Sequence, residues 1–344
     1  MLVRLFSFVF LLIGAACGSA TERIEFSGQT MGTTYNIVVT QQVGDLTPEA
    51  LQTTVEARLE AVNASYSNWD PQSEVSRFNS RESLDPVVIS SGFRDMLRMA
   101  ETVHEASDGK FDLTLRPVIE LWGFGPSGRV TQQPEQDAID RAMSEVGQNT
   151  AILLSADGGK LRKTVPGASI DLAAIAKGYG IDQIAAELAG LGVEGFMVEI
   201  GGDLYVSGQT DRDSPWRIGI ERPDAGLQGV QQVIEFSDLG MATSGDYRNY
   251  FEEDGIRYSH IIDASTGRPI THRTASVTVL AGSAALADAW ATALLALGVD
   301  AGLSIAEEEE LAALFIVREE NTSASDFKLV SSSHFERLQA AQED

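Results

Sequence analysis

The spacing of hydrophobic and polar positions predicts a mixture of strands and helices along the first half of the chain. Residues 23–39 alternate in the manner of extended structure, and residues 50–62 carry an apolar stripe at helical spacing. A second amphipathic helix is predicted over residues 91–106. The apolar residues 151–154, a turn at residues 157–159 and the stretch 160–163 predict a hairpin over residues 151–163.

The second half of the chain continues this mixture, with several strands and two strong helices. The helices are expected from about residue 172 to 191 and over residues 284–297, and the strands at residues 195–200, 216–220, 230–236, 275–280 and 311–317. Strands and helices do not follow a strict βαβ rhythm, so the pattern favours the α+β class, with sheets and helices packed together. No linker rich in proline or glycine divides the chain, which indicates a single composite unit.

The N-terminal segment has the pattern of an export signal. Arg4 precedes an apolar run over residues 5–13, and the small residues at positions 14–16 lead directly to Cys17. This arrangement predicts a lipoprotein signal peptide over residues 1–16, with Cys17 as the mature N-terminus. Cleavage after Ala20 by the ordinary signal peptidase is the alternative. The expected location is the periplasmic face of the bacterial inner membrane, with a lipid as the membrane anchor.

Cysteine count and net charge narrow the chemistry. Cys17 is the only cysteine, which excludes disulfides, a cysteine nucleophile and a thiolate metal site from the mature chain. The formal net charge is −25, and such a surface repels nucleic acid, so no nucleic-acid partner is expected. A phosphate-bearing ligand would need a local cation, and a bound metal is the obvious one.

The helix over residues 284–297 is the most informative segment. It is apolar on nearly all sides and carries Asp288 as its single charge. A lone buried carboxylate is costly, and Thr292 lies four residues away on the same face. A hard cation such as Mg²⁺ would accept both oxygens. The alternative is that Asp288 pairs with a backbone amide or an arginine, and that Thr292 bonds to its own helix.

Two further segments are candidates for ligand binding. Asp171 stands at an expected helix start, with Lys177 further in and glycines at positions 178 and 180. A free backbone beside a ligand would explain the glycines. The alternative is that Asp171 is a helix N-cap and that the glycines only allow close packing. Residues 241–247 contain a glycine and three hydroxyl-bearing side chains, which could cradle a phosphate or simply turn the chain.

His260 is the candidate general base, because histidine titrates near neutral pH. A hydrogen-bonded structural histidine is the alternative. The chain contains no Walker loop and no GxGxxG after a strand, so the familiar nucleotide-binding folds have no support.

Taken together, these motifs resemble the ApbE family, the FAD:protein FMN transferases. The resemblance runs from about Phe26 to the end of the Asp288 helix, within an expected ApbE-like, T-fold-like domain of residues 22–335. The matching runs, in the order of the family, are residues 29–35, 73–79, 109–114, 170–179, 199–203, 243–247, 260–267 and 287–293.

The resemblance implies a role for each matching site residue. The residues expected to contact FAD are Met31, Trp69, Lys110, Phe111, Asp112, Asp171, Lys177 and Ile262. Mg²⁺ is expected on Asp288, Thr292 and the backbone carbonyl of Ala174, and His260 is the expected base. Two positions depart from the family pattern: Trp69 stands where many relatives have tyrosine, and Ala291 stands where some carry a further acid.

The activity that the resemblance implies is Mg²⁺-dependent transfer of FMN from FAD to a threonine hydroxyl of a client flavoprotein, with release of AMP. Subunits of membrane redox complexes are the expected clients. Three alternatives remain at the level of the sequence. They are an Mg²⁺-dependent FAD pyrophosphatase, a non-catalytic FAD-binding lipoprotein, and a solute-binding lipoprotein with two similar lobes.

Overall fold

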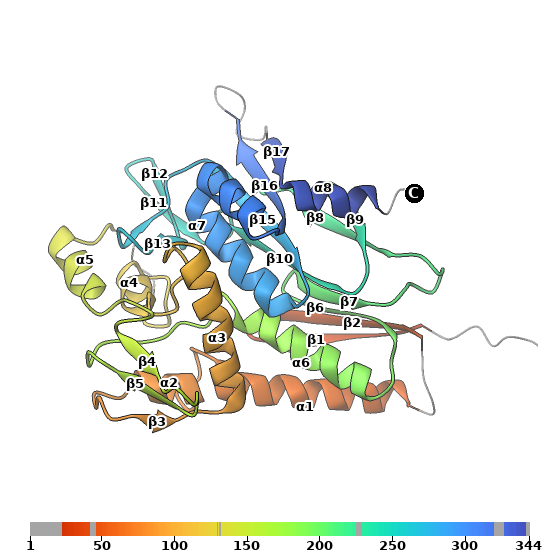
Figure 1. The fold of residues 1–344 in the computed structure, drawn as a ribbon, viewed down its shortest axis with the longest axis horizontal. Coiled ribbons are helices and arrows are strands. Elements are labelled where there is room, and N and C mark those ends of the chain that lie inside the picture. Colours follow the sequence, from red (N-terminus) through yellow and green to blue (C-terminus); the bar gives the residue numbers. More distant parts are fainter. Residues whose placement is uncertain are drawn as a thin grey trace, which may run out of the picture.

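The computed structural model describes residues 23–41, 46–128, 130, 132–224, 229–319 and 327–341. The predicted signal peptide and Cys17 lie outside these residues. At the centre is an eight-stranded sheet in the order β1-β2-β6-β7-β10-β15-β16-β17, with every neighbouring pair antiparallel (Figure 1). Its strands are Ile24–Thr30, Thr33–Gln41, Gly195–Ile200, Asp203–Ser207, Leu239–Gly245, Thr274–Ala281, Ala312–Arg318 and Phe327–Ser331.

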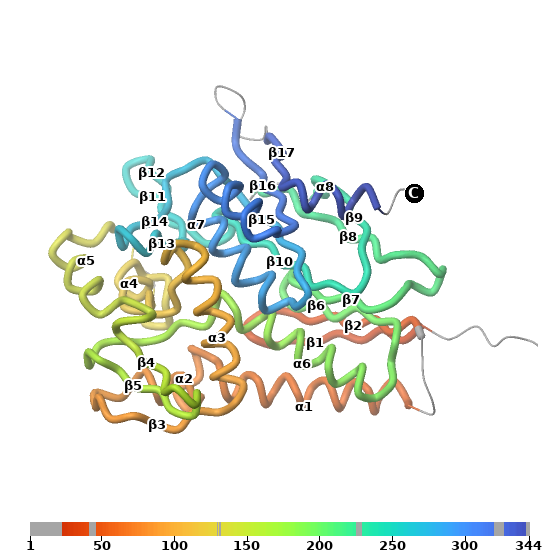
Figure 2. The backbone as a smooth tube through the Cα atoms, in the orientation of Figure 1, coloured from red at the N-terminus to blue at the C-terminus, as the bar shows by residue number. Residues whose placement is uncertain are grey.

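Different elements cover the two faces of this sheet. Helices α6 (Ala176–Gly190) and α7 (Ala284–Glu308) pack on one face, and α1 (Pro48–Tyr66) lies alongside α6 (Figure 2). The other face is covered by the hairpin of β8 (Trp216–Glu221) and β9 (Val230–Phe236) together with α8 (Ser333–Ala340). Both faces are therefore buried.

A smaller lobe joins this body beside α7 (Figure 1). It holds α3 (Ser91–Ala106), a three-stranded sheet in the order β3-β5-β4, and short helices. The strands are Val87–Val88, Lys160–Lys163 and Ile152–Leu154, and the helices α2, α4 and α5 are Glu74–Asn79, Arg116–Leu121 and Gln136–Met143. One cluster of buried apolar side chains runs from α3 through α7 to β15 and β16, so the lobe and the central sheet share a core.

Helix α7 is the central element of that core. It is long and apolar enough to cross a membrane by composition, yet it packs between the sheet and α3. Asp288 is only 3% exposed, which confirms that the nearly uncharged helix is buried. The helix continues past residue 297 to Glu308 across a kink at Gly298, where φ is 76°.

Most of the predicted elements are present, and the exceptions have physical reasons. The helix expected from about residue 172 begins only at Ala176, because Asp171 folds back to accept the amide of Ala173 and the chain makes a turn first. Residues 241–245 belong to β10, although their small side chains lack the usual strand signature. The two-stranded pairs β11–β12 (Tyr250–Glu253, Ile256–Ser259) and β13–β14 (Ile262–Asp263, Arg268–Pro269) were also not predicted.

The small side chains of β10 let α7 approach the sheet closely. A Cβ placed on Gly240 would lie 2.4 Å from the backbone nitrogen of Ala284. We therefore expect Gly240→Ala to lower the free energy of unfolding by about 1–3 kcal/mol through overpacking, measured by urea denaturation. Gly190→Ala is the matched control, because no atom lies within 4 Å of its added Cβ. Equal stability of the two variants would contradict this packing argument.

Candidate functional site

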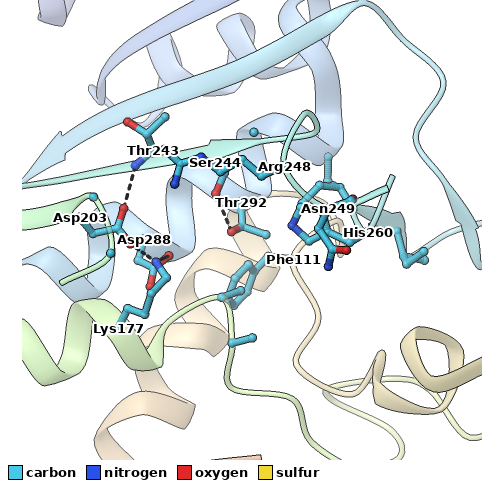
Figure 3. Close-up of a pocket in the computed structure, with 18 of the residues that line it drawn as sticks. Phe111, Lys177, Asp203, Thr243, Ser244, Arg248, Asn249, His260, Asp288 and Thr292 are labelled. Atoms are coloured by element: carbon cyan, nitrogen blue, oxygen red, sulfur yellow. Dashed lines mark hydrogen bonds and ion pairs between the residues drawn. The ribbon is translucent and has the colours of Figure 1, made fainter. Parts of the chain in front are cut away.

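A cavity of about 420 Å³ opens where the lobe meets the central sheet. Its walls come from the starts of α6 and β7, the ends of β8 and β10, α7, and the segments around residues 110–115 and 260–262. In Figure 3, Lys177, Asp203 and Asp288 lie on one side of the cavity, and Asn249 and His260 lie on the other. All of the predicted site residues line it except Met31 and Trp69.

Two buried carboxylates share one ammonium group in this cavity. Lys177 Nζ bonds Asp203 Oδ2 and lies 3.5 Å from Asp288 Oδ1. The second oxygen of each acid accepts a backbone amide: Thr243 N is 3.1 Å from Asp203 Oδ1, and Gly178 N is 3.2 Å from Asp288 Oδ2. Asp288 thus has the backbone partner that the alternative interpretation expected, and a lysine in place of an arginine.

Thr292 faces the cavity and does not bond to its own helix. Its hydroxyl lies 3.0 Å from the hydroxyl of Ser244 at the end of β10. Asp288 and Thr292 therefore present two oxygens from one face of α7, as their four-residue spacing predicted.

A partly buried asparagine holds the loop that carries Asp171. Asn79 Nδ2 donates to the carbonyl of Ile170 and Asn79 Oδ1 accepts the amide of Ile170, both at 2.7 Å. The amide of Asp171 then donates to the carbonyl of Leu113 at 2.7 Å. Burial raises the pKa of Asp171, while the Ala173 amide opposes that shift. The turn brings Ala174 to the cavity wall ahead of α6.

The predicted Lys110-Phe111-Asp112 segment forms part of the cavity wall. Lys110 Nζ donates to Asp263 Oδ1 at 2.6 Å and to Ser265 Oγ at 2.8 Å. Burial of Asp263 favours its neutral form, but hydrogen bonds from Lys110 and Ser265 hold the pKa of Asp263 below its ordinary value. Asp112 accepts hydrogen bonds from the backbone amides of Thr114 and Gln148, and these bonds fix the conformation of its own segment.

His260 is held in one orientation on the opposite wall. Its Nδ1 lies 3.0 Å from the carbonyl of Asn249, and a carbonyl can only accept, so Nδ1 carries the proton. Nε2 is then the nitrogen with the free lone pair. Burial lowers the pKa of His260, and the bond to Asn249 and the charge of Asp246 offset this only in part. The ring is therefore a neutral base near neutral pH.

Met31 and Trp69 are the two predicted FAD contacts that lie away from this cavity. Met31 occupies the tight turn between β1 and β2 with φ at 49°, and its methyl group packs near Gly180. The indole of Trp69 is 70% exposed after the end of α1. A role for these two residues in binding FAD stays a prediction.

The structure adds site residues that the sequence reasoning missed. Asp203 directly follows the Gly-Gly turn of a motif that was noticed but given no role. On the far wall, Glu221 accepts the hydroxyl of Tyr247 at 3.1 Å and pairs with Arg248. Sequence spacing could not have predicted that Glu221 contacts residues 247 and 248, because β9 and β10 lie between them along the chain.

Comparison with known proteins identifies the family. The sequence profile of the ApbE family matches residues 31–315. The chain belongs to the ApbE family.

The relatives of this ApbE chain cover nearly its full length. The FAD:protein FMN transferase of Vibrio cholerae is 41% identical over 94% of this chain and 95% of its own, and that of Haemophilus influenzae is 40% identical over 96% and 95%. The solved flavin transferase ApbE from Vibrio cholerae superposes with a TM-score of 0.84 at 39% identity, covering 92% of this chain and 99% of its own. These matches confirm the ApbE-like α+β fold and the transferase class predicted from the motifs.

The predicted metal ligands in this cavity are all oxygen donors. In the part of the chain that the structure describes, no group of three or more His, Cys, Asp or Glu side chains is placed to hold a metal. The predicted set has one carboxylate, one hydroxyl and one backbone carbonyl, on Asp288, Thr292 and Ala174, and these three residues line the same cavity. Such hard oxygen donors fit Mg²⁺, which keeps several ligand positions for phosphate and water.

Asn79 should matter for stability because both ends of its amide bond the backbone of Ile170. We expect Asn79→Ala to lower the free energy of unfolding by about 1–3 kcal/mol, since it leaves buried backbone groups without partners. Gln52→Ala removes an exposed amide that bonds Glu56 and should change the stability by less than about 0.5 kcal/mol. Urea denaturation measures both free energies. An unchanged free energy of unfolding in Asn79→Ala would show that these hydrogen bonds do not stabilise the Asp171 loop.

Proposed function

We propose that this protein is a Mg²⁺-dependent FAD:protein FMN transferase that moves FMN from FAD to a threonine hydroxyl of a client flavoprotein and releases AMP. One observation carries the proposal. A histidine with a free Nε2 and the oxygens of Asp288 and Thr292 line one cavity, in a chain 41% identical to a transferase of that name. The cavity volume lies in the range of small-molecule sites.

The reaction is a phosphoryl-group transfer in which His260 moves the proton. The threonine oxygen attacks the phosphorus on the FMN side of the FAD pyrophosphate. A bond from this oxygen to phosphorus forms as the bond from phosphorus to the AMP oxygen breaks. Nε2 of His260 accepts the proton of the hydroxyl, because Nδ1 is already committed to the carbonyl of Asn249.

The remaining residues bind and orient the dinucleotide. The chemistry that Mg²⁺ supplies, when held by Asp288, Thr292 and the carbonyl of Ala174, is neutralisation of pyrophosphate charge. Lys177 adds a cation on the same wall, which matters in a chain with a net charge of −25. The apolar ring of Phe111 and the side chain of Ile262 provide surfaces for the flavin or adenine rings.

We further propose that the enzyme acts outside the cytoplasm. The apolar leader ending at Cys17 supports export and lipid attachment to the periplasmic face of the inner membrane. Clients there would be flavoprotein subunits of membrane redox complexes. Mass spectrometry of the mature N-terminus tests the anchor, since a diacylglyceryl adduct on Cys17 is expected and an unmodified Thr21 N-terminus would contradict it.

An activity assay tests the transfer itself. Purified protein is incubated with FAD, Mg²⁺ and a client fragment carrying one threonine, and the client mass and AMP are followed. We expect equal amounts of AMP and of client heavier by one FMN, and we expect Asp288→Ala to abolish both. Asp300→Ala, an exposed acid on the same helix, is the control and should retain activity. AMP without flavinylated client would instead identify a pyrophosphatase, and no AMP would contradict both enzymes.

The pH dependence tests His260. A base must be unprotonated, and burial lowers the pKa of His260, so kcat/KM should fall only as the pH drops below the usual histidine range. His260→Gln should reduce kcat/KM roughly 100- to 10,000-fold and remove this acidic limb. His334→Gln, an exposed histidine on α8, serves as the control. An unchanged acidic limb in His260→Gln would show that another group takes the proton.

A further inference from the structure

The carboxylates of Asp203 and Asp288 form an unusual pair with a single cation. Both residues are nearly inaccessible, at 2% and 3% exposure. Within the described residues, Lys177 is the only cationic side chain that bonds either of them. Two buried anions and one cation leave a local excess of one negative charge, which a further cation would relieve.

The two acids hold the ammonium group unequally. Nζ is in close contact with Asp203 Oδ2 but 3.5 Å from Asp288 Oδ1, at the outer limit of a hydrogen bond. The other oxygen of each acid is fixed by a backbone amide, so neither carboxylate can turn freely. Asp288 Oδ1 is therefore the more weakly bound oxygen, and it belongs to the residue that fits a metal ion.

We propose that Lys177 is a resident counter-ion for Asp288 and that Asp203 is the residue that retains its ammonium group when Mg²⁺ binds. In the metal-free protein the ammonium group partly neutralises Asp288. When the metal takes Asp288 Oδ1, Lys177 is held by Asp203 alone and is not expelled from the cavity. Asp203 is thus a positioning residue that lowers the competition between Lys177 and the metal. This inference rests on the metal role in the proposed function.

Removing the two partners of this ion pair should have opposite effects. Asp203→Asn keeps the oxygen that accepts the Thr243 amide but frees Lys177 to bond Asp288 fully, so Mg²⁺ should bind about tenfold more weakly. Lys177→Gln removes the competitor, so Mg²⁺ should bind more tightly than in the wild type. A purely structural role would instead weaken metal binding in both variants.

A double-mutant cycle separates this mechanism from simple charge effects. Titration calorimetry with Mg²⁺ alone, repeated with FAD present, measures the affinity of the wild type, Asp203→Asn, Lys177→Gln and the double variant. We expect Asp203→Asn to have little effect once Lys177 is absent, because there is no ammonium left to retain. If Asp203→Asn weakens binding equally in both backgrounds, the carboxylate acts only through its charge and the inference is wrong.

Two controls distinguish failure of the inference from failure of the proposed function. Asp288→Ala should lose Mg²⁺ binding and Asp300→Ala should keep it. Unchanged binding in Asp288→Ala, or no Mg²⁺ uptake by the wild type in either condition, would contradict the metal site and this inference with it. Loss of binding in Asp288→Ala alone, with Asp203→Asn and Lys177→Gln unaffected, would overturn only the inference. Urea denaturation confirms that each variant is folded.

Discussion

A carboxylate buried on the otherwise uncharged first half of α7 has to be compensated, and much of the architecture around α7 provides that compensation. The amide of Gly178 reaches Asp288 because α6 crosses α7 at close range, where a Cβ on Gly178 would lie 2.3 Å from the carbonyl oxygen of Ala284. The first turn of α6 also delivers Lys177. Close packing of α6 on α7 is therefore needed to neutralise Asp288, because only then do the Gly178 amide and the Lys177 ammonium group reach its carboxylate.

The order of strands in the sheet completes the site. Strands β7 and β10 are neighbours although about thirty residues separate them, so the Thr243 amide of one strand meets the Asp203 carboxylate of the other. The lobe supplies another part of the wall through the segment that begins at Lys110 and through the Asp171 loop, which Asn79 fixes by hydrogen bonds. Stacked aromatic rings of Trp122, Phe251 and Tyr258 hold the β11–β12 pair against α4, and His260 follows directly after that pair. The lobe therefore fixes the predicted base, whereas the predicted metal ligands lie on α7 and on the turn before α6.

Local patterns were enough to predict the long elements and many of the site residues. The helices α1, α3 and α7 have clear apolar stripes, and Asp288 stood out because it was the one charge among alanines. The motifs that carry the family resemblance supplied the other predicted residues of the cavity lining. Strand β10 could not be predicted from the sequence, because the small residues that let α7 approach are not typical of strands.

Contacts between distant segments were beyond the reach of sequence patterns. The ion pair between Asp203 and Lys177 depends on strand order, and the hydrogen bonds of Asn79 with Ile170 join residues 91 positions apart. The start of α6 was misjudged for a related reason. Asp171 signalled a helix N-terminus, but its side chain closed a turn instead, and this turn carries Ala174 to the cavity.

The complete burial of Ala291 limits which side chains this position can accept. This methyl group is fully buried on α7, one residue before Thr292. Replacing this methyl group with an acidic side chain would add volume and an unpaired charge to the packed interior around α7, so the change would need both space and a new cationic partner. A second carboxylate directly before Thr292 is therefore opposed by packing and by charge at the same time.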